Sequence, residues 1–289
     1  MSIDTPSATV ASADGTVIAY ERRGSGPSVV LVGGAFMTRG DSAGLAALLA
    51  ERFTVLTYDR RGRGDSGDSP VYDVRREVED LDALIQGPAG GSAMVFGMSS
   101  GAVLALEATA RGSAVSRLAL YEPPFVTDDS RPPLPDDYVE RLTELVAKEA
   151  YGDAVAHFMT AAVGLPEEVV AGMRQAPFWA GMEAVARTLP YDGRIMGDTM
   201  SGRPLPVGRW ASVTVPVLVG SGDAGAPHML TGARELAASA GNYTLRVFPG
   251  EEHAIAPEVL APALADFFAE SAASAPATGS ATAGEGHTA

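Results

Sequence analysis

Two short stretches of this 289-residue chain fit the pattern G-x-S-x-G, in which a serine on a sharp turn acts as a nucleophile. They are GDSAG at 40–44 and GMSSG at 97–101. The turn must follow a buried strand and open a helix, and its glycines let strand and helix approach closely. Ser99 has this context, with AMVF before and AVLALEA after, whereas Ser42 follows the polar MTRGD. The pattern favours Ser99 as nucleophile and predicts that Asp41 or Ser42 caps a helix.

A serine nucleophile needs a base, and the chain has only four histidines. His253 closes VFPGEEH, just past the last expected core strand, where a side chain can lean over the carboxyl edge of a sheet. The other three lie within a helical pattern, at a helix start and in the C-terminal tail: His157, His228 and His287. We therefore predict that His253 is the base.

The imidazole in turn needs a carboxylate that holds it in the tautomer that accepts the serine proton. Asp223 ends VPVLVGSGD, at the carboxyl end of the penultimate expected strand. Taken alone, it is equally well explained as a turn aspartate. The chain order Ser…Asp…His favours the catalytic interpretation, with Glu122 in YEPP as the alternative acid.

The elements that must position these residues are short apolar runs alternating with amphipathic helices. Such alternation is typical of an α/β fold with a mostly parallel sheet covered by helices on both faces. The opening SATVASADGTVIAYERRG alternates around DG, as an antiparallel hairpin at a sheet edge would. Strands are expected at 27–34, 53–59, 92–97, 115–124, 213–223 and 243–250, and later helices at 229–240 and 257–270.

Residues 126–210 interrupt this alternation with helical patterns that lack strands. We expect them to form a helical cap inserted between two parts of the core, 1–125 and 211–270. The Ala/Ser/Thr/Gly-rich stretch 271–289 is predicted to be a disordered tail. Apolar residues of the cap, and of the loop after the first buried strand, predict an apolar substrate pocket: Phe36, Met37, Phe158, Met159, Phe178, Trp179 and Met182.

Together these motifs resemble the α/β-hydrolase fold superfamily over about residues 8–270. The resemblance rests on FGMSSG, VLVGSGD, FPGEEH, SADGTVIAYERRGSGPSVVLVGG and LTYDRRGRGDS. It is strongest to the small capped esterase, haloperoxidase-like and carbon–carbon hydrolase members. In that pattern Ser99 is the nucleophile, His253 the base and Asp223 the acid.

The resemblance also implies an oxyanion hole made by the backbone N–H groups of Ala35 and Ser100. Relatives usually carry His-Gly where this chain has Gly33-Gly34, a change that could loosen the oxyanion loop. The residue before the nucleophile, often His, is Met98 here.

The expected function is that of a serine hydrolase that cleaves a small apolar ester or thioester through an acyl-enzyme, with no metal or cofactor. Carbon–carbon hydrolysis or perhydrolysis by the same triad is one alternative, and a binding protein or non-hydrolytic cyclase on the same fold is another. GRGDSG at 62–67 fits G-x-G-x-x-G, but DSPVYD separates it from any helix, which argues against a dinucleotide site. We expect DRRGRGDSGDS to be a solvated, ion-paired loop.

Composition narrows the class of partner. A formal net charge of −15 disfavours nucleic acid and anionic membranes and leaves a small-molecule substrate. The chain has no cysteine, so disulfides and thiolate chemistry are excluded. The first residues lack the features of a secretion signal, and no apolar run is long enough to span a bilayer, so we expect a cytoplasmic protein. The sequence leaves the oligomeric state open.

Overall fold

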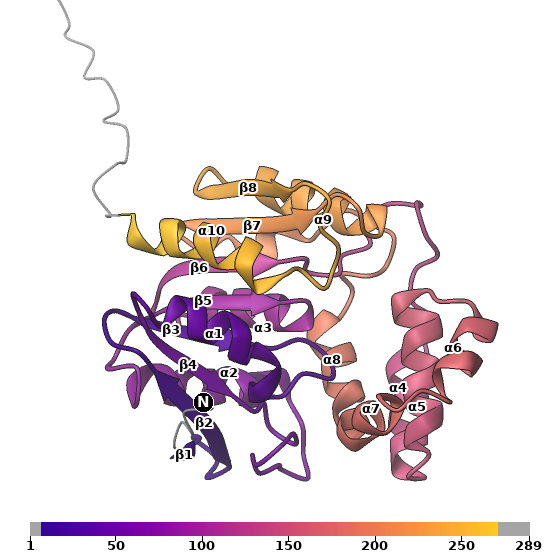
Figure 1. Ribbon diagram of the computed structural model, residues 1–289. Coiled ribbons are helices and arrows are strands. Elements are labelled where there is room, and N and C mark those ends of the chain that lie inside the picture. Colours follow the sequence, from indigo (N-terminus) through magenta and orange to yellow (C-terminus); the bar gives the residue numbers. More distant parts are fainter. Residues whose placement is uncertain (1–6, 271–289) are drawn as a thin grey trace, which may run out of the picture.

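The computed structural model describes residues 7–270 and contains one eight-stranded sheet in the order β1-β2-β4-β3-β5-β6-β7-β8 (Figure 1). The predicted tail at 271–289 lies outside the described residues. The strands are β1 (Ser7–Ala11), β2 (Val17–Arg23), β3 (Ser28–Val32), β4 (Thr54–Tyr58), β5 (Ala93–Met98), β6 (Val115–Tyr121), β7 (Val217–Gly222) and β8 (Tyr243–Phe248).

Strand directions confirm the predicted sheet. All neighbouring pairs from β4 to β8 are parallel, and only β2 runs against its neighbours, β1 and β4. The predicted edge hairpin is the β1–β2 pair, joined across the Asp14–Gly15 turn. Because parallel strands end at the same edge, the residues that follow β5, β6, β7 and β8 gather there.

Helices cover both faces of the sheet. Successive strand residues point to opposite faces, so in β3 Val30 packs with one hydrophobic cluster and Leu31 with the other. One cluster includes α2 (Val74–Gln86), α3 (Ser100–Ala110) and α9 (Pro227–Ala238). The other includes α1 (Ala43–Leu49) and α10 (Pro257–Ala269).

Between β6 and β7 the chain is helical and builds a third hydrophobic cluster of its own, which lies beside the sheet in Figure 1. We call these helices the cap helices. Among them α8 also packs against α2 and α3 of the core. The cap helices are α4 (Tyr138–Ala147), α5 (Tyr151–His157), the π-helical η2 (Phe158–Val163), α6 (Glu167–Met173), α7 (Trp179–Val185), the 3-10 turn η3 (Ala186–Thr188) and α8 (Leu189–Met196).

Two short 3-10 turns complete the fold, η1 (Arg39–Ser42) before α1 and η4 (Val207–Trp210) before β7. Within residues 7–270 the helices are all too short or too polar to cross a bilayer.

Candidate active site

The strand-to-helix turn after β5 holds Ser99 in a strained conformation. Its φ of 56° and ψ of −129° are values that a residue other than glycine rarely adopts. The Ser99 N–H donates to the Tyr121 carbonyl at 2.9 Å, and its carbonyl accepts from Ala102 N–H at 2.9 Å. Ser99 therefore makes one hydrogen bond to the neighbouring strand β6 and one to the first turn of α3, and these two bonds hold its backbone in place. Strained backbone of this kind is found at functional sites.

The glycines around Ser99 are required by packing, as expected from the sequence. A Cβ at Gly97 would stand 2.5 Å from the Gly101 carbonyl oxygen, and one at Gly101 would stand 2.4 Å from the Val32 carbonyl oxygen. A Cβ at Gly34 would come within 2.8 Å of Ser99 Cβ. The turn thus brings Ser99 against the loop after β3.

His253 follows β8 and is paired with Glu122, which follows β6. Its Nδ1 lies 2.7 Å from Glu122 Oε2, and the carboxylate is almost fully buried. The other carboxylate oxygen, Oε1, accepts from Gly222 N–H at 2.9 Å and from Ser221 Oγ at 3.1 Å. Tyr121 Oη donates to the Glu252 carbonyl at 2.7 Å, which ties the histidine loop to β6.

This geometry corrects the choice of Asp223 as the orienting acid. Its Oδ1 accepts from Gly250 N–H at 2.7 Å in an exposed turn, which matches the turn interpretation, and Glu122 holds the imidazole instead. Both residues follow neighbouring strands, but β6 lies beside β5, where Met98 pairs with Tyr121. Glu122 therefore stands next to Ser99 at the carboxyl edge.

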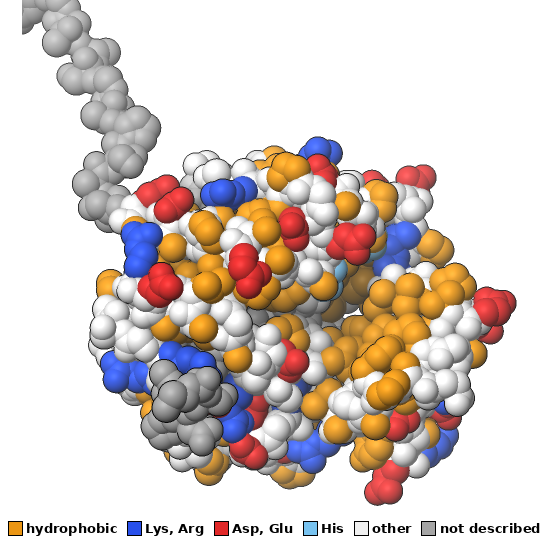
Figure 2. Space-filling model, in the orientation of Figure 1, with side chains coloured by type: hydrophobic (Ala, Val, Ile, Leu, Met, Phe, Trp, Pro, Cys, Tyr) orange, Lys and Arg blue, Asp and Glu red, His pale blue; other side chains and the backbone are white. Residues whose placement is uncertain are grey.

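Ser99, Glu122 and His253 line one cavity of about 380 Å³ beneath the cap helices. Figure 2 shows a hollow between the sheet-bearing body and these helices, bordered by hydrophobic side chains. The size is at the lower end of the usual range for small-molecule sites. Its apolar side chains come from the cap helices, their connecting segments and α9: Leu134, Phe158, Val163, Leu165, Met196, Met200 and Met229.

The predicted pocket residues are only partly in this cavity. Phe158 lines it, and Phe36 packs edge-to-face on Phe158 with ring centroids 5.0 Å apart. Trp179 is buried in the cap's own cluster, where its Nε1 donates to Glu183 at 3.0 Å, and Met182 packs against that cluster. Phe178 is an exposed side chain, and Met159 also packs in the cap cluster. Apart from Phe158, these predicted residues pack in the hydrophobic cluster of the cap or lie on its surface, and they do not line the cavity.

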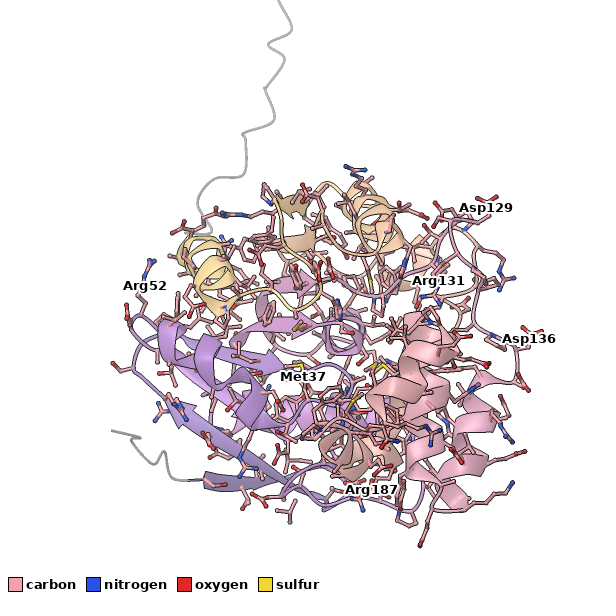
Figure 3. The ribbon with its side chains drawn as sticks, turned by 45° about the vertical axis from the view of Figure 1, so that its right-hand side comes forward. Met37, Arg52, Asp129, Arg131, Asp136 and Arg187 are labelled. Carbon is pink, nitrogen blue, oxygen red and sulfur yellow. The ribbon has the colours of Figure 1, made fainter. Side chains whose placement is uncertain are left out.

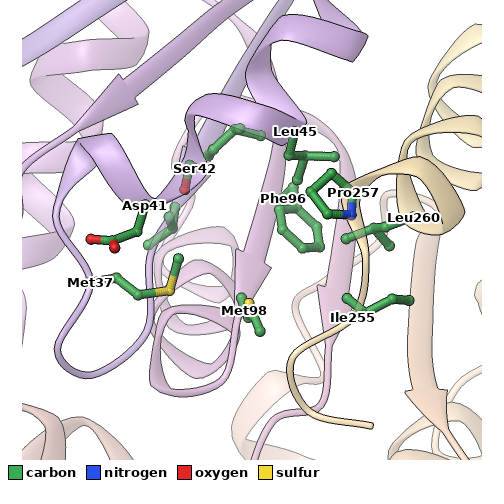
Figure 4. A pocket seen from close by; sticks show the side chains of 11 residues that line it. Met37, Asp41, Ser42, Leu45, Phe96, Met98, Ile255, Pro257 and Leu260 are labelled. Carbon is green, nitrogen blue, oxygen red and sulfur yellow. The ribbon is translucent and has the colours of Figure 1, made fainter. Parts of the chain in front are cut away.

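Met37 and Ser42 line a second, smaller cavity of about 70 Å³ (Figure 4). Its lining is mostly apolar and includes no histidine, so Ser42 has no base beside it. Ser42 is the N-cap residue of α1, but its hydroxyl makes no capping bond. The N-cap residue of η1 is Thr38, and Asp41 completes its capping box as the N3 residue, since its carboxylate accepts from the Thr38 N–H at 2.7 Å. Only the second G-x-S-x-G stretch therefore stands at a strand-to-helix turn.

The two backbone N–H groups expected to form the oxyanion hole flank Ser99. Ser100 opens α3, so its N–H belongs to a first turn that has no acceptor within the helix. Ala35 lies in a turn closed by a 3.4 Å bond from Met37 N–H to the Gly34 carbonyl, with Phe36 at φ 62°. Both Ala35 and Ser100 line the cavity. Their N–H groups are donors suited to negative charge that develops beside Ser99.

The loop after β4 is ion-paired as expected, but its three arginines are buried rather than solvated. Arg60, Arg61 and Arg63 are each at most 2% exposed. Arg60 pairs with Glu77, and Arg61 pairs with Asp80. A buried guanidinium requires such a partner. The sequence carried a signal for this, because both acids lie on the apolar, buried face of α2.

His228 lines the cavity and is buried, so burial lowers its pKa to about 4, with further lowering by Arg131. Arg131 caps the C-terminal end of the π-helix η2, because its guanidinium donates to the Ala161 and Ala162 carbonyls at 2.8 Å (Figure 3). His228 is therefore neutral near pH 7. Within residues 7–270 there is no group of three or more His, Asp or Glu side chains suited to a metal ion.

Known proteins with a similar sequence or structure share this architecture. A model of the alpha/beta hydrolase family matches residues 29–266. A solved alpha/beta hydrolase from Sphaerobacter thermophilus DSM 20745 is 54% identical, with a TM-score of 0.84 over 90% of this chain and 100% of that one. An uncharacterized hydrolase, YraK, of Bacillus subtilis (strain 168) is 38% identical over 96 residues, which is 32% of this chain and 35% of that protein. This match thus spans about a third of the relative's length.

More distant structures share the fold. The enol-lactonase of Burkholderia xenovorans LB400 is 23% identical, with a TM-score of 0.65 over 92% of this chain and all of that one. The esterase EaEST of Exiguobacterium antarcticum is 21% identical, with a TM-score of 0.66 over 91% of this chain and 99% of that one.

Proposed function

Because this chain belongs to the alpha/beta hydrolase family, we propose that it is a serine hydrolase in which Ser99 attacks the carbonyl carbon of a small ester or thioester. The observation that carries the proposal is the contact of His253 with buried Glu122, at 2.7 Å, in the same cavity as the strained Ser99. A nucleophile, a base and an orienting acid in one cavity are the parts that acyl transfer needs.

In this mechanism His253 takes the proton of Ser99 as the hydroxyl oxygen bonds to the substrate carbonyl carbon. Glu122 holds Nδ1 protonated, which leaves Nε2 free to accept that proton, and stabilises the imidazolium that forms. The N–H groups of Ala35 and Ser100 bind the oxyanion, a contribution of about 3 kcal/mol each. The leaving alcohol or thiol takes its proton from His253. Water, deprotonated by the same imidazole, then hydrolyses the acyl-enzyme.

The size and the apolar lining of the cavity suit a substrate with a small, largely apolar acyl or alcohol group. Its lining by leucine, methionine and phenylalanine side chains matches the apolar substrate expected from the sequence. A carbon–carbon hydrolase or a perhydrolase would use the same residues. A pure binding protein would need no base beside the serine, whereas a cyclase would use the base only for proton transfer.

The decisive experiment joins labelling with turnover. Purified protein is treated with a fluorophosphonate, and the label is mapped to a peptide. It is also assayed with p-nitrophenyl esters, thioesters and β-diketones. We expect a label on Ser99, lost in Ser99→Ala and retained in Ser42→Ala, and turnover of short esters.

Faster cleavage of a β-diketone than of any ester would favour the carbon–carbon hydrolase. A label on Ser42, or ester turnover by Ser99→Ala at the wild-type rate, would contradict the proposed mechanism. An unlabelled protein that turns over none of these substrates would favour the binding or cyclase alternative.

A further inference from the structure

Two buried arginines donate hydrogen bonds to backbone carbonyls of the loop that carries Ala35. Arg63 Nη1 donates to the Gly34 carbonyl at 2.5 Å and to the Met37 carbonyl at 3.2 Å. Arg60 Nη1 donates to the Gly33 carbonyl at 3.4 Å. Met37 lies between the sheet and the cap helices in Figure 3. Cationic donors thus hold three carbonyl groups of this loop.

The bond to the Gly34 carbonyl has a direct effect on the oxyanion hole. That carbonyl and the Ala35 N–H belong to one planar peptide group and point in opposite directions. Fixing the carbonyl toward Arg63 therefore fixes the N–H on the opposite side. A rotated peptide would instead present its carbonyl oxygen where the N–H should be. A charged donor on the carbonyl also polarises the peptide and strengthens its N–H as a donor.

A single carboxylate of the cap holds these arginines in place. Asp192 of α8 accepts from Arg63 Nη2 through Oδ2 at 2.7 Å, and from Arg60 Nη1 through Oδ1 at 2.7 Å. The same Oδ1 accepts from Ser100 Oγ at 2.7 Å. Asp192 therefore contacts the side chain of one residue that supplies an oxyanion donor, Ser100, and supports the peptide of the other, Ala35.

Electrostatics keep this carboxylate ionised. Burial would raise the pKa of Asp192, but the charges of Arg63 and Arg60 and the bond from Ser100 outweigh it and hold the pKa below its usual range. Glu77, which takes two hydrogen bonds from Arg60, balances the second positive charge. Buried ion pairs contribute little net stability compared with apolar packing. This network instead fixes the orientation of the guanidinium groups that donate to the Gly33 and Gly34 carbonyls.

Arg61, from the same loop, provides a contrast. It is equally buried and makes two bonds to Asp80, at 2.7 and 2.8 Å, but it faces α2 and Asp14. None of its hydrogen bonds reaches the loop of Gly34 and Ala35.

From these contacts we propose that Arg63 and Asp192 are positioning residues of the oxyanion hole, so that the hole is complete only while α8 is docked on the core. The inference rests on the proposed function, because the hole has a role only if Ser99 attacks a carbonyl. It assigns the cap a role beyond lining the cavity. It also accounts for how the Gly33-Gly34 segment is held in place.

The test compares Arg63→Gln and Asp192→Asn with the matched control Arg61→Gln. For each protein, kcat and KM for a p-nitrophenyl ester, the rate of fluorophosphonate labelling and Tm are measured. The affinity for an alkyl trifluoromethyl ketone, whose adduct carries an oxyanion, is measured beside that for an unreactive amide of the same shape.

We expect Arg63→Gln and Asp192→Asn to lower kcat and the labelling rate by about 10²-fold, as loss of one oxyanion donor does. Affinity for the trifluoromethyl ketone should fall in parallel, whereas KM and affinity for the amide stay within about threefold. Arg61→Gln should lower Tm while its folded fraction keeps the wild-type kcat and ketone affinity.

Milder variants decide the matter if the first pair does not fold. Thr188→Val removes the 2.9 Å bond that Arg63 Nε donates to Thr188 Oγ1, and Ser100→Ala removes the bond to Asp192. Either should lower kcat and ketone affinity together, by about tenfold. Wild-type kcat and ketone affinity in the folded variants would overturn this inference and leave the proposed function standing. Wild-type protein without a label on Ser99 would overturn both.

Discussion

Replacing Glu122 with Gln tests which carboxylate orients His253, because the structure dictates how the new amide must lie. The Gly222 N–H is a fixed donor 2.9 Å from Oε1, so the Gln oxygen must take that place. The amide NH₂ then faces His253 Nδ1, where the carboxylate oxygen now lies at 2.7 Å. An NH₂ group can only donate, so Nδ1 must be the unprotonated nitrogen and Nε2 carries the proton.

That tautomer cannot accept the proton of Ser99. Loss of the correct tautomer in a Ser-His-Asp triad lowers kcat about 10⁴-fold. The same factor, about 5.5 kcal/mol in the barrier, is expected for Glu122→Gln. The fold should remain intact because both bonds to Oε1, from Gly222 N–H and Ser221 Oγ, are kept.

The matched control is Asp223→Asn, whose Oδ1 can still accept from Gly250 N–H. Because the Asp223 side chain is exposed and does not line the cavity, this change should alter kcat by no more than about twofold. Both variants are assayed by ester hydrolysis and by the rate of fluorophosphonate labelling, with circular dichroism to check folding. If Asp223→Asn loses activity and Glu122→Gln keeps it, the assignment of the acid is wrong.

Three further changes test other parts of the site. Unfolded His228 takes up a proton near pH 6.5 but the folded residue only near pH 4, so stability should fall as pH drops through that range, by up to about 3 kcal/mol. Urea unfolding at pH 7 and 4.5 should show a smaller fall for His228→Gln, and an equal fall would refute the argument. Gly34→Ala should lower kcat about 10²-fold by displacing Ser99, whereas Gly40→Ala, with only a 3.8 Å contact, should not; equal kcat values would contradict the close approach. Phe158→Ala should enlarge the cavity and shift the best p-nitrophenyl ester toward longer acyl chains, and an unchanged preference would remove Phe158 from the substrate site.

The sheet and the strained serine turn could be predicted from sequence because each depends on local patterns. Continuous apolar runs require burial on both faces, and the glycines around Ser99 reflect contacts within a few residues and with the adjacent β3. The family model over residues 29–266 agrees with that architecture.

The orienting acid could not be fixed in this way. Glu122 and Asp223 both follow core strands, and both lie between Ser99 and His253 in the chain, so sequence order does not separate them. The choice depends on strand order, which places β6 beside β5, and on the Gly222 N–H that receives Glu122. These are tertiary facts with no local signature.

The link from the buried arginines to the cap was also beyond local patterns. Asp192 lies 129 residues from Arg63, so nothing near the loop indicates its partner. The distinction between cavity and cap core was equally hidden, because Phe158 and Trp179 lie in similar apolar helical patterns. Only packing decides which side chain faces the substrate.

The position of Glu122 after β6 has a consequence for how this protein can change over evolution. In the proposed mechanism the stretch 223–226 after β7 carries no catalytic side chain, yet Gly225 and Ala226 form part of the cavity wall. Substitutions there can alter which molecules fit without passing through an inactive intermediate. Gly222, the residue before this stretch, cannot be replaced in the same way, because a Cβ there would lie 2.0 Å from the Glu251 carbonyl oxygen. This loop is therefore the natural starting point for directed evolution of a new substrate preference.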